Sequence, residues 1–140
     1  PKEIIQLLRQ KARPYLFSNA LMPAIVAGTI RALDLVQEAN EDREHLIAMS
    51  SWWKNELVAA GFDIKEGSTP IVPIMLYDSK LAQSFSKKLF EYGVYAVGFF
   101  FPVVPKDQAR IRTQISSSHT KEQLQEALEI FKKVKTELTV

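Results

Sequence analysis

The residues best suited to chemistry are the arginines, hydroxyls and histidine of residues 109–119. Apolar and polar side chains alternate along residues 109–115, which predicts a strand that carries Arg110, Arg112 and Gln114 on one face. A guanidinium presents paired donors in a rigid fork, which fits a carboxylate with two parallel hydrogen bonds. The strand is therefore suited to bind a small anion. The simpler alternative is a half-buried strand whose polar face is only solvated.

A run of hydroxyls, Ser116–Ser118, follows this strand and leads directly to His119. A serine next to a histidine suggests a nucleophile and its base, but a catalytic triad also needs an acid that orients the histidine, and none is evident. Thr120 and Gln123 match the capping box with which many helices begin. We therefore interpret the hydroxyl run and the histidine as a loop before a helix, and assign no catalytic residue to this chain.

A second candidate site is Ser18 and Asn19, which precede an apolar helical pattern that starts near residue 20. Ser and Asn are favoured at helix N-caps, and Pro23 is tolerated in the first helical turn. A helix N-terminus offers free amides and the positive end of the helix dipole, so the pair is also suited to contact a phosphate. From these residues alone, a plain helix cap is the default interpretation.

The remaining pattern predicts the elements that must position these residues. Apolar residues at helical spacing predict helices over residues 2–10, 20–36, 41–60, 79–92 and 121–135. Strand-like runs predict strands over residues 71–76, 94–101 and 109–115, and an extended segment over 15–17. Pro73 favours an edge strand or a bulge. This order predicts an α/β or α+β domain in which helices pack on a small, largely antiparallel sheet.

Composition excludes several functional classes. The net charge of +2, with no run of like charge longer than a pair, argues against a broad nucleic-acid surface. The absence of Cys excludes disulfides and thiolate chemistry, and His45 and His119 are too far apart to suggest a zinc cluster. We interpret His45 as a solvated surface residue. No apolar run approaches the ~20 residues that a membrane span needs, so we expect no metal, nucleic-acid or membrane partner.

The chain begins with Pro1 and with a helical pattern that has no capping residue before it. This pattern is typical of the end of a helix that began earlier. We therefore expect a fragment of a longer protein, in which residues 1–20 end a large domain or linker and residues 21–140 form a C-terminal small domain.

Two stretches carry a resemblance to a known family. The first is Arg13–Asn19 with Pro23, and the second is Phe101–Pro105 running into residues 109–114 and His119–Thr120. In this order and separation they resemble the C-terminal part of the α-oxoamine synthases, which are pyridoxal-phosphate enzymes of fold type I. The resemblance extends over essentially the whole chain. It is greatest to the members that condense glycine with acetyl-coenzyme A to 2-amino-3-oxobutyrate in threonine breakdown.

The resemblance implies roles for particular residues. It implies that Arg112 binds the carboxylate of the amino acid, and that Ser18 and Asn19 contact the cofactor phosphate of the neighbouring subunit. It gives Arg110 a structural or outer role. It also implies a homodimer with pyridoxal phosphate as its cofactor. The absence of Cys and of a targeting signal fits a cytoplasmic protein. No lysine here has the glycine-rich setting in which the family holds the cofactor, so the chain alone is expected to be inactive and free of pyridoxal phosphate.

Two alternatives stay open at this point. One is another synthase of the same family, such as the enzyme that makes 8-amino-7-oxononanoate from alanine and a longer acyl thioester. The other is a stand-alone α/β binding or regulatory module that shares only the architecture.

Overall fold

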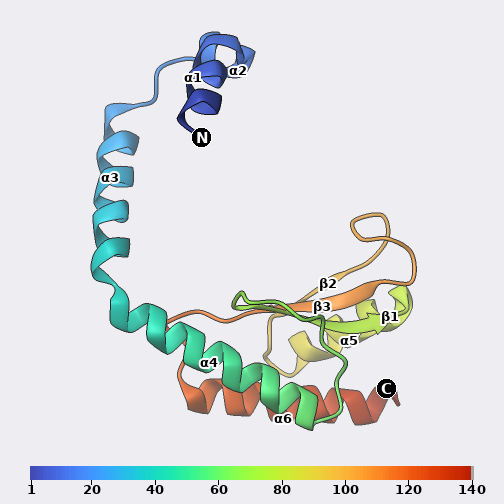
Figure 1. Ribbon diagram of the computed structural model, residues 1–140. Coiled ribbons are helices and arrows are strands. Elements are labelled where there is room, and N and C mark those ends of the chain that lie inside the picture. Colours follow the sequence, from blue (N-terminus) through green and yellow to red (C-terminus); the bar gives the residue numbers. More distant parts are fainter. Residues whose placement is uncertain (140) are drawn as a thin grey trace. The chain divides into compact units, whose positions relative to one another are not determined.

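The computed structural model describes residues 1–139 and consists of two units, Pro1–Asn40 and a second unit from Glu41 onward (Figure 1). The first unit contains α1 (Lys2–Lys11), α2 (Arg13–Leu16) and α3 (Pro23–Glu38). The second contains α4 (Asn40–Ala59), β1 (Ile71–Tyr77), α5 (Ser79–Glu91), β2 (Val97–Phe99), β3 (Ala109–Gln114) and α6 (Lys121–Leu138). The assignment of residues 1–20 to a preceding domain stays a prediction.

Two local predictions in the first unit are wrong. The segment expected to be extended forms the short helix α2, because Pro14 occupies its first turn, where a missing N–H removes no hydrogen bond. Helix α1 ends at Ala12, whose extended backbone also forms the N-cap of α2. The second error concerns α3, which begins at Pro23 with Met22 as its N-cap and no side-chain cap. Ser18 and Asn19 therefore precede the helix without capping it.

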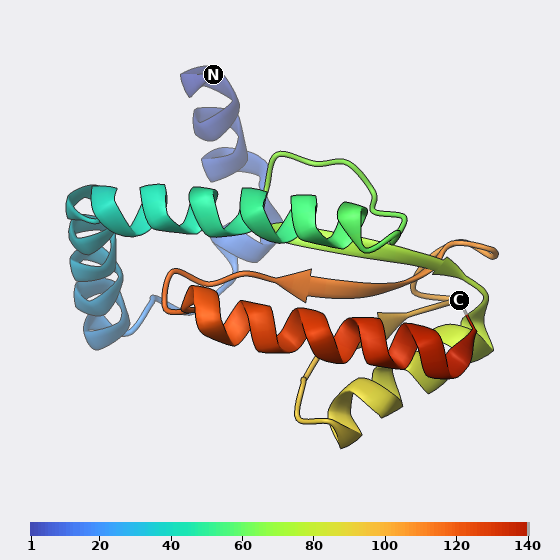
Figure 2. The ribbon, with the colours of Figure 1, turned by 90° about the horizontal axis from the view of Figure 1, so that it is seen from below.

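The second unit is built on a three-stranded antiparallel sheet with the strand order β1-β3-β2. The expectation of helices on a small, largely antiparallel sheet is confirmed. Helices α4, α5 and α6 lie on one face of this sheet, and α4 and α6 run side by side in the same direction (Figures 1 and 2). Asp78 caps α5 and Thr120 caps α6 with the expected capping box. Among residues 1–139, none of the helices combines the length and apolar character needed to cross a bilayer.

The core lies between the sheet and these helices. The inward face of the strands and the predicted stripes of α4, α5 and α6 supply the side chains. At its centre, the ring of Phe131 on α6 meets Trp53 of α4 edge to face, with the ring centroids 5.6 Å apart. Phe62 and Phe85 also pack against Phe131. The aromatic cluster thus fixes how the helices sit beneath β3.

Strand β1 forms an edge of the sheet and contains a bulge between Met75 and Tyr77, as Pro73 suggested. Its outer side is partly paired with the preceding loop. The amide of Lys65 donates to the carbonyl of Pro73 at 2.9 Å, and the amide of Met75 donates to the carbonyl of Asp63 at 2.8 Å. The proline therefore lies where its missing N–H faces away from β3.

Strand β2 pairs with β3 only over Val97–Phe99, which is shorter than the predicted 94–101. Gly98 brings it close to α5, since a Cβ atom there would lie 3.1 Å from the carbonyl oxygen of Ala82. The preceding residues 94–96 separate from the end of β3. A surface cavity of about 520 Å³ opens between them and α6. Close packing against α5 thus takes precedence over a longer β ladder.

Candidate functional site

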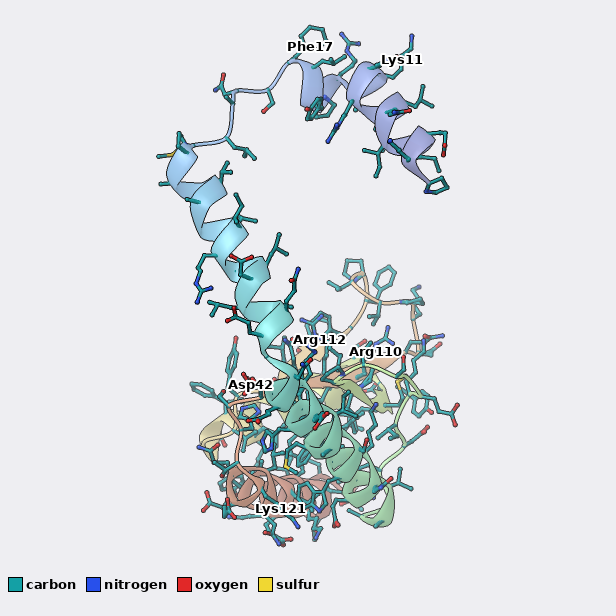
Figure 3. The ribbon with its side chains drawn as sticks, turned by 60° about the vertical axis from the view of Figure 1, so that its left-hand side comes forward. Lys11, Phe17, Asp42, Arg110, Arg112 and Lys121 are labelled. Carbon is teal, nitrogen blue, oxygen red and sulfur yellow. The ribbon has the colours of Figure 1, made fainter. Side chains whose placement is uncertain are left out.

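Strand β3 places its arginines as the alternation predicted. Ala109, Ile111 and Thr113 are buried, whereas Arg112 is exposed and Arg110 is half-buried. Figure 3 shows both arginines on the side of the sheet away from α6. The carboxylate-binding candidate therefore stands on the open face of the central strand.

The surroundings of Arg112 on this face are mainly apolar. In the antiparallel registers, Arg112 lies opposite Pro73 of β1 and Val97 of β2. Arg110 lies opposite Met75 and Phe99. Side chains opposite one another on antiparallel strands share a face, so the guanidinium projects from an apolar surface. An apolar surround strengthens the attraction between a cation and an anionic ligand by limiting competition from water.

The guanidinium of Arg112 lies over the ring of Phe99, with 4.4 Å between the guanidinium carbon and the ring centroid. Within residues 1–139, no ion pair or hydrogen bond engages its nitrogen atoms. The face of an aromatic ring attracts the cation without supplying a carboxylate or carbonyl acceptor, so donors remain for a ligand. The fork is thus oriented by an aromatic ring and has donors left for a ligand.

A buried hydrogen-bonded pair supports the strand beneath this arginine. The indole nitrogen of Trp53 donates to the hydroxyl of Thr113 at 3.0 Å, and that hydroxyl donates to the carbonyl of Val72 at 3.0 Å. Each polar group in this short chain is satisfied, although Trp53 and Thr113 are both buried. The bonds join α4 and β1 to β3 at the residue next to Arg112.

The loop after β3 has the structural role expected of it. The amide of Ser116 donates to Nδ1 of His119 at 3.1 Å, and the hydroxyls of Ser116 and Ser118 lie 2.9 Å apart. Nε2 of His45 lies 3.0 Å from the carbonyl oxygen of His119. His45 is exposed, as predicted, and also contacts this loop. The ring of His119 holds the loop rather than activating a serine.

Ser18 and Asn19 are exposed and lie between α2 and α3 in the first unit. Arg112 belongs to the second unit, so the two predicted sites lie in different units. Within residues 1–139, no side-chain hydrogen bond engages Ser18 or Asn19. The hydroxyl and amide are therefore free to donate to a phosphate, which accepts hydrogen bonds from such groups. Among residues 1–139, no group of three or more His, Cys, Asp or Glu side chains is placed to hold a metal ion.

Phe99 is the site residue that sequence reasoning missed. Nothing in the apolar run 94–101 singles it out, because most residues there are β-branched or aromatic and suit a strand. The useful signal was the period of two, which places Val97 and Phe99 on the same face as one another. Only the register with β3 shows that this face carries Arg112.

Comparison with known proteins identifies a matching family and similar enzymes. Residues 1–131 match the family described as aminotransferase class I and II. The chain is 47% identical over 139 residues to 2-amino-3-ketobutyrate coenzyme A ligase from Escherichia coli K12, covering 99% of this chain and 35% of that protein. It is 49% identical over 139 residues to 8-amino-7-oxononanoate synthase from Thermosipho melanesiensis, covering 99% of this chain and 36% of that protein.

A solved serine palmitoyltransferase from S. paucimobilis with bound PLP has the same fold, with a TM-score of 0.88 and 28% sequence identity. The match covers 96% of this chain and 34% of that one. The chain thus spans about a third of the length of the proteins that it matches.

Proposed function

Because the chain belongs to the aminotransferase class I and II family, we propose that it is part of a pyridoxal-phosphate-dependent glycine C-acetyltransferase. In the proposed reaction, a bond forms between the α carbon of glycine and the acetyl carbonyl carbon of acetyl-coenzyme A. The thioester carbon–sulfur bond breaks, and the proton lost from the α carbon is balanced by the one gained by the coenzyme A thiol. The products are 2-amino-3-oxobutyrate and free coenzyme A.

The observation that carries this proposal is the open fork of Arg112 on an apolar sheet face. Its guanidinium lies over the ring of Phe99 and makes no ion pair within residues 1–139. Two parallel hydrogen bonds to the carboxylate of glycine would hold the α carbon in one orientation. Arg110, half-buried on the same face, supports the strand and adds positive charge nearby.

The chain's own contribution to the cofactor is a phosphate contact from Ser18 and Asn19. Their donors fit a phosphate, and the uncapped start of α3 at Pro23 adds the positive end of a helix dipole a few residues later. When bound, pyridoxal phosphate supplies an electron sink for the charge that develops at the α carbon of glycine. The lysine that would hold the cofactor belongs, in this proposal, to the remainder of the protein.

The proposal includes a homodimer in the cytoplasm, with Ser18 and Asn19 serving the cofactor of the neighbouring subunit. Every residue of α1 and α3 lies outside the buried core, and their apolar residues, such as Ile30 and Leu33, are exposed. In the whole protein, these surfaces are covered by the remaining domain and by the second subunit. Size-exclusion chromatography with light scattering of the full-length protein tests the dimer.

Arg112→Ala in the full-length protein is the direct test. Removing a charge-assisted, bidentate partner costs roughly 1.5–3 kcal/mol, so the KM for glycine should rise about 10- to 100-fold. The release of coenzyme A from acetyl-coenzyme A, measured over a range of glycine concentrations, gives this value. Gln114→Ala, on the same face of the same strand, is the matched control. An unchanged KM for glycine in Arg112→Ala would refute the assignment.

The second candidate function is 8-amino-7-oxononanoate synthesis, which the 49% identity to the Thermosipho melanesiensis protein favours. Its substrates differ from glycine and acetyl-coenzyme A in both the amino acid and the acyl chain. Assays of the full-length enzyme with glycine or alanine, each paired with acetyl-coenzyme A or a longer acyl thioester, separate the two functions. Turnover with alanine and the longer thioester alone would select the second.

A further inference from the structure

We propose that Phe99 is a positioning residue that presents the guanidinium of Arg112 to the carboxylate of the amino-acid substrate. This inference rests on the proposed function, because it assumes that Arg112 binds that carboxylate. Its basis is the cation–π contact between Arg112 and Phe99, which come from different strands and have 4.4 Å between the guanidinium carbon and the ring centroid.

This cation–π contact is diagonal across the sheet. Val97 is the residue directly opposite Arg112, and Phe99 is opposite Arg110. Diagonal neighbours on one face of an antiparallel pair lie about 7–8 Å apart at the backbone, a distance that aromatic and long side chains can bridge. The arginine therefore leans along the strand toward Phe99, and its direction is set by the ring instead of by its own flexible stem.

The position of the ring is itself fixed by the preceding residue. Gly98 has no Cβ, and this allows β2 to approach the carbonyl oxygen of Ala82 on α5, which a Cβ atom would meet at 3.1 Å. The hydroxyl of Ser86, one turn later on α5, donates to the carbonyl of Ala96 at 2.7 Å. These contacts attach the start and the middle of the short strand to a core helix. Phe99 thus stands on a rigid support.

A ring positions an arginine differently from a carboxylate. An acidic partner would orient the guanidinium by occupying the donors that a substrate needs. An aromatic face attracts the cation through its quadrupole and leaves the N–H groups, which lie in the guanidinium plane, free at their edges. Restricting the rotation of the fork before binding reduces the entropy lost when the carboxylate docks. Phe99 therefore raises affinity without competing for the ligand.

The test compares Phe99→Leu with Phe99→Tyr in the full-length protein. Leucine retains apolar bulk but has no aromatic face, whereas tyrosine retains the ring. We expect Phe99→Leu to raise the KM and the calorimetric Kd for glycine about three- to tenfold, given the strength of cation–π contacts. The kcat and the KM for acetyl-coenzyme A should stay within about twofold, and Phe99→Tyr should match the wild type. Phe90→Leu, at an exposed ring on α5, is the control for the same substitution elsewhere.

Each other outcome is decisive. If Arg112→Ala raises the KM for glycine but Phe99→Leu does not, this inference is wrong and the proposed function stands. If Arg112→Ala has no effect, the proposed function fails and this inference fails with it. Equal impairment by Phe99→Tyr and Phe99→Leu would show that packing alone matters. If Phe99→Leu does not fold, Phe99→Met provides the flexible, non-aromatic replacement, with the same outcomes.

Discussion

Replacing Thr113 by valine removes one hydroxyl beneath the sheet and leaves the shape of the side chain almost unchanged. In the structure, this hydroxyl accepts a hydrogen bond from the indole N–H of Trp53 and donates one to the carbonyl of Val72, both at 3.0 Å. Thr113 is 8% exposed and Trp53 is 2% exposed, so water does not replace the lost partner. The substitution therefore leaves a buried donor without an acceptor.

An unsatisfied buried donor costs about 1–3 kcal/mol, so we expect Thr113→Val to lower the free energy of unfolding by about 2 kcal/mol. For a unit of this size, such a loss lowers the Tm by roughly 8–15 °C. Urea unfolding followed by tryptophan fluorescence and circular dichroism measures it. The midpoint should fall while the m-value stays constant, because the surface exposed on unfolding is unchanged.

The matched control is a double-mutant cycle with Trp53→Phe, which removes the donor and keeps an aromatic ring. In the Trp53→Phe background, Thr113→Val should cost at least about 1 kcal/mol less than in the wild type, because no indole N–H remains to be stranded. A change of less than about 0.5 kcal/mol in the free energy of unfolding on Thr113→Val alone, or additivity of the two substitutions, would refute the role of this buried hydrogen bond.

Two further predictions concern stability. Ser50 on α4 is 4% exposed, and within residues 1–139 its hydroxyl has no hydrogen-bond partner, so Ser50→Ala should raise the free energy of unfolding by about 1 kcal/mol in urea titrations. The pKa of Glu137 is lowered by hydrogen bonds from Lys88 and Tyr92. Its contribution to stability is therefore present above the unfolded pKa of about 4.3 and is lost as the pH falls through the lower folded pKa. In thermal unfolding, Glu137→Gln should reduce the fall of the Tm between about pH 5 and 3. An unchanged dependence of the Tm on pH would contradict this prediction.

The sequence predicted the second unit better than the first. The alternation of β3 and the stripe of α6 describe buried faces, and burial is encoded directly in the order of apolar and polar residues. The side chains of α1 and α3 have no partner in a core of their own. The start of α3 therefore had to be predicted from local sequence preferences alone. The helix begins at Pro23 and not directly after Ser18 and Asn19, although Ser and Asn are favoured as N-caps.

Only one of the two residues of the candidate site could be predicted from the sequence. Arg112 is identified by its type and its place in the alternation, which are properties of β3 alone. Its partner Phe99 depends on the register between two strands that are ten residues apart along the chain, and no local pattern sets that register. The early end of β2 likewise depends on the close approach of Gly98 to α5, which is a tertiary contact.

The outer side of β1 has a consequence for how this protein meets other molecules. At Pro73 the outward N–H position is missing, and its carbonyl is already bonded to the amide of Lys65; the amide of Met75 is bonded to Asp63. A strand from another molecule would find almost no free backbone donor at the middle of this edge. Growth of the sheet by recruitment of further chains, the first step toward fibrils, is therefore blocked at β1 by covalent structure as well as by pairing.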